Sequence, residues 1–192
     1  MKIYDISQEL FSCEIYPGDP NPQKETLCSI SNGDVCNLTA LSLCAHNGTH
    51  IDAPYHFYDE GKTIDSLPLE SLVGDCYVSE HEGIMTDIDA QRILNDADGC
   101  KKILIKGDAT VSLEAARIFG SAALDLLGNE SQTVGPKDAP MAVHLELLGK
   151  DIILLEGIRL SHVPEGRYLL NAAPVNLGGC DGAPVRAILI EI

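Results

Sequence analysis

The stretch CAHNGTHIDAPYHF, residues 44–57, holds three histidines and an aspartate in close succession. His46, His50, Asp52 and His56 form the pattern H-x3-H-x-D-x3-H in a chain that has six histidines altogether. A lone histidine is more often a packed or surface residue than a ligand, but that explanation fits a cluster of three poorly. Imidazole and carboxylate groups are donors that Zn²⁺, Mn²⁺ and Fe²⁺ accept. The pattern therefore predicts a divalent metal site, with a structural hydrogen-bond network as the alternative.

The number of ligands in this stretch favours a catalytic metal over a structural one. Three protein ligands leave a coordination position for water, whereas a structural zinc site is closed by four ligands, usually including cysteine. Cys44 is a weak candidate for a fourth ligand, because on a strand it would share a face with His46. Asn47 and Gly48 are typical of a tight turn between ligands.

His144 and Glu156 are the candidates for a second half of the site. Pro140 and Gly149 are expected to open and close a helix, and residues 151–156 (DIILLE) form an apolar strand that ends at Glu156. The helix climbs only ~8 Å beyond His144, and the strand returns over ~16 Å. The two side chains can therefore meet. The alternative is an exposed Glu156 and a His144 that packs on the helix face.

The rest of the chain alternates strand and helix patterns, which predicts a mixed α/β or α+β fold in a single domain over residues 1–192. Thr86 with Asp89, and Ser112, are expected to cap helices. We expect strands at 2–6, 35–45, 75–80, 101–107, 151–156, 167–175 and 184–192, helices at 87–95, 113–119 and 140–149, a loop at 16–22, and either a helix or a strand at 122–128.

Composition narrows the class of protein. The net charge of −16 gives no basic face for nucleic acid, and no apolar run reaches the ~18 residues of a membrane span. The start, MKIYDISQELF, does not look like a secretory signal. The seven cysteines are widely spaced, with no CxxC. We therefore expect reduced thiols in a cytoplasmic protein that binds neither nucleic acid nor membrane.

The segment HNGTHIDAPYHF, residues 46–57, resembles the HxGTHxDxPxH signature of the cyclase-like metal-dependent hydrolases, which include bacterial kynurenine formamidase and isatin hydrolase. DIS at 5–7, YPGD at 16–19 and CDGAPVR at 180–186 are similar to further family segments. The family also has a later His and Glu twelve residues apart, as His144 and Glu156 are here. The resemblance spans nearly the whole chain. GDATVSLEA at 107–115 and TVGPKD at 133–138 depart from the segments usual in formamidases.

The resemblance implies a ligand set for one or two metal ions per subunit. His46, His50 and Asp52 would bind one ion, and Asp52, His144 and Glu156 a second, with both carboxylates bridging. Zinc is the metal we expect first, with manganese and iron as alternatives.

The resemblance also implies the surroundings of the metal. His56 would be the general acid/base, and Tyr16 would line the substrate pocket, where formamidases usually carry tryptophan. The implied fold is the swivelling β/β/α domain of the family, assembled as a homodimer or homotetramer.

The activity implied is hydrolysis of a C–N amide bond in a small molecule, with N-formyl-L-kynurenine going to L-kynurenine and formate. A metal lowers the pKa of its bound water toward ~7, and the resulting hydroxide attacks the carbonyl while His56 transfers the proton. Alternatives on the same site are a dehydratase or a ring-opening hydrolase of a cyclic amide or lactone. A metal-dependent binding protein without turnover is the non-enzymatic alternative.

Overall fold

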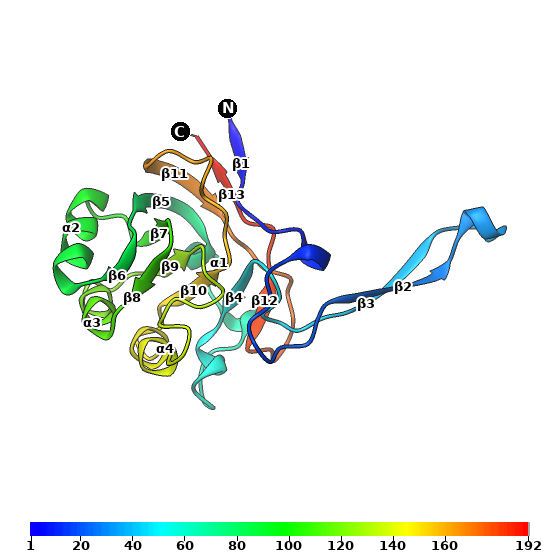
Figure 1. The fold of residues 1–192 in the computed structure, drawn as a ribbon, viewed down its shortest axis with the longest axis horizontal. Helices are drawn as coiled ribbons and strands as arrows, with labels where there is room; N and C mark the ends of the chain where they lie inside the picture. The colour runs from blue at the N-terminus through cyan, green and yellow to red at the C-terminus, as the bar shows by residue number, and fades with distance from the viewer. Residues whose placement is uncertain (192) are drawn as a thin grey trace.

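A curled, mixed β-sheet forms the body of the protein in the computed structural model, which describes residues 1–191 (Figure 1). Within those residues the main sheet has nine strands in the order β1-β13-β11-β5-β7-β9-β10-β4-β12. The strands are β1 (Ile3–Asp5), β2 (Gln23–Cys28), β3 (Leu38–Ser42), β4 (His50–Asp52), β5 (Val73–Glu80), β6 (Gly83–Met85), β7 (Lys102–Lys106), β8 (Ala109–Val111), β9 (Leu126–Asn129), β10 (Ile153–Glu156), β11 (Gly166–Asn171), β12 (Gly182–Pro184) and β13 (Ile188–Ile190). The helices are α1 (Leu69–Leu72), α2 (Asp87–Ala97), α3 (Leu113–Ser121) and α4 (Met141–Leu148).

In the main sheet, strands β5, β7, β9 and β10 run parallel, and the strands that flank them pair antiparallel. A separate two-stranded sheet pairs β6 with β8 in parallel. Helices α2, α3 and α4 form a layer on one side of this parallel centre (Figure 1). Parallel strands need crossover connections, and helices supply them here. The mixed α/β class expected from the sequence is therefore confirmed.

Local capping chemistry sets the start of two helices, as the sequence predicts. Thr86 accepts a hydrogen bond from the Asp89 backbone N–H, and the Asp89 side chain accepts one from the Thr86 backbone N–H. Ser112 accepts from the Ala115 backbone N–H and caps α3. These bonds satisfy donors that the first turn of a helix leaves free.

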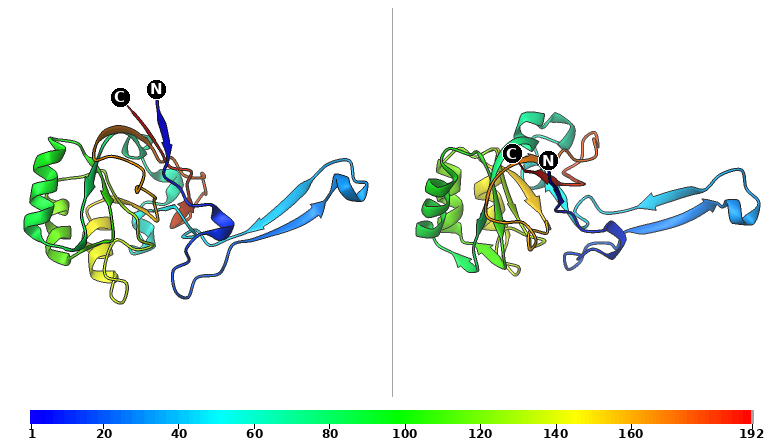
Figure 2. Two further views of the ribbon diagram at one scale, coloured as in Figure 1. Left: turned by 45° about the horizontal axis from the view of Figure 1, so that its top comes forward. Right: turned by 90° about the horizontal axis from the view of Figure 1, so that it is seen from above.

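Alternation along the central strands separates two apolar cores. In β7, Leu104 packs into the core on one face, while Ile103 and Ile105 pack into the core under the helices. The same alternation places Leu155 of β10 on the first face and Leu154 on the second. Figure 2 shows the helix layer on the second face from two further directions.

The C-terminal segment differs from the single strand expected over 184–192. It is divided into β12, which pairs with β4 at one edge of the sheet, and β13, which pairs with β1 and β11 near the other edge. Only residues 185–187 separate the two strands, and three residues span about 10 Å. The sheet therefore curls far enough to bring its two ends together. Residue 192 lies outside the described residues.

The segment 122–128, which the sequence leaves open between helix and strand, contains the start of β9. Strand β9 is buried along its whole length and pairs parallel with β7 and β10, whereas Ala122 and Ala123 at the start of the segment are exposed.

A two-stranded arm projects from the body, formed by β2 and β3 (Figures 1 and 2). The sequence predicts a strand at 35–45, and the structure places one at Leu38–Ser42. The partner strand β2 is not anticipated, because its sequence QKETLC does not alternate apolar and polar residues. Most side chains of both strands are exposed.

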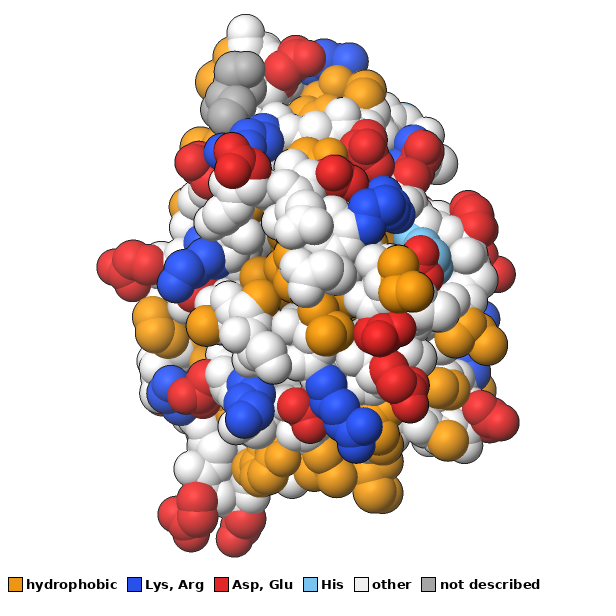
Figure 3. Space-filling view, turned by 90° about the vertical axis from the view of Figure 1, so that its left-hand side faces the viewer, with side chains coloured by type: hydrophobic (Ala, Val, Ile, Leu, Met, Phe, Trp, Pro, Cys, Tyr) orange, Lys and Arg blue, Asp and Glu red, His pale blue; other side chains and the backbone are white. Residues whose placement is uncertain are grey.

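The expectations about charge, membrane spans and cysteines can be compared with the structure. On the face shown in Figure 3, acidic and basic side chains are interspersed rather than gathered into a block of one sign. None of the helices in residues 1–191 combines the length and apolar character that crossing a bilayer requires. Each of the seven cysteines is a free thiol in the structure.

Candidate metal centre

Strand β4 carries the centre of the site. His50 and Asp52 lie on one face of β4, and Ile51 between them points to the opposite face and into the core. Strand β10 pairs antiparallel with β4, in a register that sets Glu156 opposite His50. Both carboxylates are almost completely buried, with Asp52 1% and Glu156 2% exposed. Two buried carboxylates on one sheet face require hydrogen-bond donors or a cation.

Helix α4 brings His144 to these carboxylates. His144 Nε2 lies 3.3 Å from Glu156 Oε1 and 3.6 Å from Asp52 Oδ2. The connection predicted from the sequence, a short helix followed by a returning strand, therefore brings the two side chains together. His50 Nε2 completes the ring of contacts, at 3.3 Å from Asp52 Oδ1 and 3.6 Å from Glu156 Oε2.

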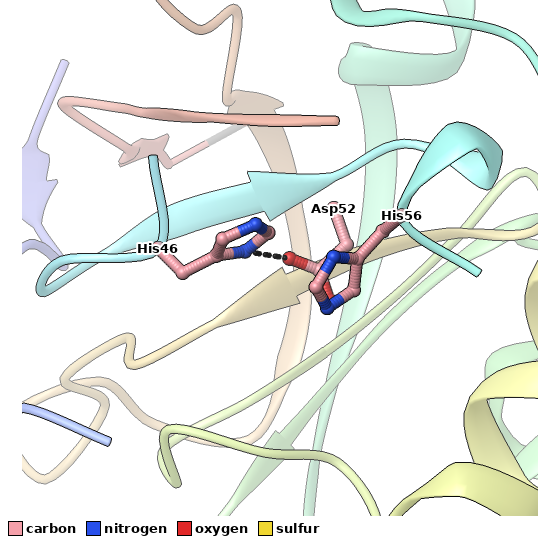
Figure 4. Close-up of side chains that lie close together, drawn as sticks. All are labelled: His46, Asp52 and His56. Atoms are coloured by element: carbon pink, nitrogen blue, oxygen red, sulfur yellow. Dashed lines mark hydrogen bonds and ion pairs between the residues drawn. The ribbon is translucent and has the colours of Figure 1, made fainter. Parts of the chain in front are cut away.

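His46 and His56 reach Asp52 from the loop before β4 and the turn after it (Figure 4). His46 Nδ1 lies 2.8 Å from Asp52 Oδ1, and the His46 and His56 ring centroids are 4.2 Å apart. One potential ligand atom from each of His46, Asp52 and His56 lies within 4.8 Å of the others, and the same holds for His50, Asp52 and Glu156. Asp52 is common to both groups.

Asp181, which the sequence reasoning does not single out, joins the two outer histidines. Its Oδ2 accepts hydrogen bonds from His46 Nε2 at 2.8 Å and from His56 Nδ1 at 3.1 Å. The one feature of the sequence that could have pointed to Asp181 is its position in the segment CDGAPVR, which contains β12, the strand paired with β4. The next residue must be glycine, because a Cβ at Gly182 would lie 2.6 Å from His46 Cε1.

Backbone carbonyls orient the two inner histidines. His50 Nδ1 lies 2.9 Å from Gly48 O, and His144 Nδ1 lies 3.0 Å from Pro140 O. A ring nitrogen facing a carbonyl must carry the proton, so in the neutral ring the lone pair is on Nε2. Each Nε2 then faces carboxylate oxygens, an arrangement that requires either a second proton on the ring or a metal ion between the groups.

The pKa shifts have the same electrostatic origin. Burial lowers the pKa of His46, but its hydrogen bonds to Asp181 and Asp52 outweigh burial and raise it to about 11. Burial likewise opposes the carboxylate contacts that raise the pKa of His50 to about 10 and that of His144 to about 9. Burial raises the pKa of Asp52, but His46 and His50 bring it well below its usual range. The site thus attracts positive charge, whether as protons or as a metal ion.

This donor set fits a divalent metal ion. Buried imidazoles with oriented Nε2 atoms and buried carboxylates are the ligands that zinc, manganese and iron accept. Cys44 lies outside both groups of potential ligands found among the described residues. The interpretation of Cys44 as a strand neighbour of His46 is wrong, because β3 ends at Ser42 and residue 44 precedes a turn.

A glycine lets the two halves of the centre approach. A Cβ at Gly157, directly after Glu156, would lie 2.4 Å from Gly48 O in the loop that carries His46 and His50. The Thr49 hydroxyl closes the same junction by donating to Gly157 O at 2.7 Å.

The centre opens into a pocket of about 240 Å³, and Tyr16 lies in its wall with Phe57. Phe57 stacks on His144, with centroids 4.9 Å apart, and meets the edge of His56 at 4.7 Å. The pocket therefore has polar groups on one side and aromatic rings on the other.

The chain is similar to known proteins along its whole length. Residues 4–122 match the family model described as Putative cyclase. The kynurenine formamidase of Salinibacter ruber is 35% identical over 98% of this chain and 97% of its own length. The kynurenine formamidase of Bacillus anthracis is 30% identical over 100% of this chain and 98% of its own length.

Solved structures of similar fold include a metal-dependent hydrolase and an isatin hydrolase. A potential metal-dependent hydrolase with cyclase activity superposes with a TM-score of 0.85 at 28% identity, covering 98% of this chain and 96% of that one. Isatin hydrolase A from Labrenzia aggregata superposes with a TM-score of 0.86 at 19% identity, covering 98% and 93%, and shows the shared fold.

Proposed function

The chain belongs to the cyclase family of metal-dependent hydrolases, and from that premise we propose that it hydrolyses N-formyl-L-kynurenine to L-kynurenine and formate. The observation that carries this proposal is the centre of two buried histidines, two buried carboxylates and the partly buried His46, in a chain similar over its whole length to kynurenine formamidases. The family already makes it a hydrolytic enzyme that acts on an amide C–N bond.

We assign His46, His50 and Asp52 to one metal ion, and Asp52, His144 and Glu156 to a second where two ions bind. Zinc is the first choice, with manganese and iron accepted by the same donors. The bound metal would polarise the amide carbonyl and generate a nucleophile from water at neutral pH.

His56 is the residue that we assign to proton transfer. Its Nδ1 donates to Asp181, so Nε2 of the neutral ring remains free to take a proton from water and return it to the leaving nitrogen. Asp181 also holds His46 through Nε2, which directs Nδ1 of His46 toward Asp52. One carboxylate oxygen therefore sets the tautomer of a metal ligand and of the acid/base group.

The purified, zinc-reconstituted protein is expected to release formate and L-kynurenine from N-formyl-L-kynurenine, followed by absorbance and by mass spectrometry. Isatin is the control substrate, because it tests ring opening on the same centre. Cleavage of isatin alone would reject the formamidase assignment in favour of a cyclic-amide hydrolase. Turnover of neither substrate, with metal bound, would reject both.

We propose that the β2–β3 arm is covered by a second copy of this chain, in a homodimer or homotetramer. A two-stranded ribbon is marginally stable alone in water, and this one exposes Leu27, Leu38 and Leu41 by 49–58%. The arm extends away from the body that carries the metal centre (Figure 2). A second copy of the chain can therefore cover the arm without any rearrangement of the body.

Replacing Leu38 and Leu41 together by aspartate is expected to convert the oligomer into monomers, because charges would then enter the apolar contact. Light scattering after gel filtration measures the mass. Ile84→Asp is the matched control, since Ile84 is 73% exposed but lies in β6, outside the arm. A wild-type mass of one chain, or an unchanged mass for the double variant, would reject the assignment.

We assign the activity to the cytoplasm. Seven free thiols, two of them in the core at Cys76 and Cys100, suit a reducing compartment.

A further inference from the structure

A second cavity adjoins the metal pocket. It has a volume of about 620 Å³ and shares Tyr16, Gln132 and Thr133 with the wall of the metal pocket. The metal pocket, at about 240 Å³, is below the roughly 300–1,000 Å³ usual for small-molecule sites. The adjoining cavity offers room for the part of a substrate that lies beyond the metal pocket.

Several charged groups of this second cavity already have partners. Both oxygens of the Glu130 carboxylate accept backbone N–H groups, from Gly107 and Leu160, each at 2.7 Å. Arg159 donates to two backbone carbonyls and lies 3.3 Å from Glu14 Oε2. These groups hold the walls of the cavity together.

Two opposite charges remain available in the same cavity. Lys137 and Asp108 both line it, and neither takes part in an ion pair within residues 1–191. The Tyr16 hydroxyl donates to the backbone carbonyl of Lys137 at 3.2 Å, which ties the lysine to a residue that also borders the metal pocket. The wall of the cavity that adjoins the metal pocket therefore includes one lysine and one aspartate that are free of ion pairs in the described residues.

We propose that this cavity binds the zwitterionic α-amino-acid end of the substrate, with Lys137 facing its carboxylate and Asp108 its ammonium group. The inference rests on the proposed function, which places the amide at the metal. A cavity with both signs of charge favours a zwitterion over a ligand of one charge, since a single charge would meet its own sign.

The test compares two substrates that differ only at that end: N-formyl-L-kynurenine and N-(2-acetylphenyl)formamide, which has the same aryl formamide and ketone without the amino acid. Lys137→Gln and Asp108→Asn are each expected to raise KM for the first substrate roughly five- to tenfold, since a charged hydrogen bond is lost. We expect kcat to change less than twofold, and KM for the second substrate to stay at its wild-type value. Lys150→Gln and Asp59→Asn, which change exposed residues outside the cavity, are the matched controls.

Binding of products separates this inference from the proposed function. Calorimetry on the zinc-loaded protein compares L-kynurenine with 2′-aminoacetophenone, which lacks the amino-acid end. Tighter binding of L-kynurenine that both cavity variants weaken supports the subsite, even if the protein hydrolyses neither formamide and the proposed function fails. Equal binding of the two compounds, or equal KM values in cavity and control variants, would overturn the subsite and leave the formamidase assignment intact.

Discussion

Replacing Asp52 with alanine is expected to remove the metal and the hydrolytic activity together. Asp52 is the carboxylate common to both groups of potential ligands, and its oxygens lie 2.8 Å from His46 Nδ1, 3.3 Å from His50 Nε2 and 3.6 Å from His144 Nε2. Without it, buried imidazoles lose the negative charge that attracts a cation. We expect the rate to fall about 10³-fold or more, because a metal supplies several kcal/mol of transition-state stabilisation, at about 1.4 kcal/mol per tenfold.

Metal content by mass spectrometry and the rate of formylkynurenine hydrolysis are measured on the same samples. Wild-type protein should hold one or two equivalents of metal, and the variant close to none. Asp59→Ala is the control, because Asp59 is an exposed aspartate close to the site in the chain. Asp52→Asn keeps the side-chain volume, and circular dichroism on both variants shows whether the fold survives. Full metal and full rate in a folded variant would contradict the assignment of the centre.

The part of the site that the sequence reveals is the part that is local in the chain. His46, His50, Asp52 and His56 lie within one strand and its flanking loops, so their spacing alone suggests that they converge. His144 and Glu156 also follow from a short helix and a returning strand, because the lengths of the two elements can be compared.

Asp181 could not be found in this way. It lies 135 residues from His46 and 125 from His56, and only the pairing of β12 with β4 brings it to them. Strands of three residues such as β12 bury too few side chains to leave a periodic pattern. The sequence also does not indicate that the C-terminal segment divides into β12 and β13. That division depends on the curl of the whole sheet, which brings its two edges together.

In the arm, the sequence predicts β3 but not β2, and the physical reason is a different one. Strand β2 faces solvent on nearly all its residues, so burial imposes no alternation on its sequence. Periodicity in a sequence reveals a strand through its buried face, and a strand that is exposed on nearly all its residues leaves no such signal. The same exposure is what motivates the proposal of a second copy on the arm.

Replacing His56 with alanine is expected to leave the metal in place and to remove most of the turnover. Loss of a general acid/base typically costs about 10²–10⁴-fold in rate, and KM should change little, because His56 is assigned to proton transfer and not to substrate binding. Asp181→Asn should give a smaller loss of about 10–100-fold, since an outer partner orients His46 and His56 without taking the proton. His162→Ala, at an exposed histidine, is the control for removal of an imidazole.

The metal content of His56→Ala distinguishes two roles that the geometry allows. His56 lies in one of the two groups close enough to share an ion, with His46 and Asp52. If it were a ligand, the alanine variant would lose metal in parallel with activity, and added zinc would restore part of the rate. Retained metal with a rate that zinc does not restore assigns His56 to proton transfer. Wild-type metal content and wild-type turnover in the variant would exclude both roles.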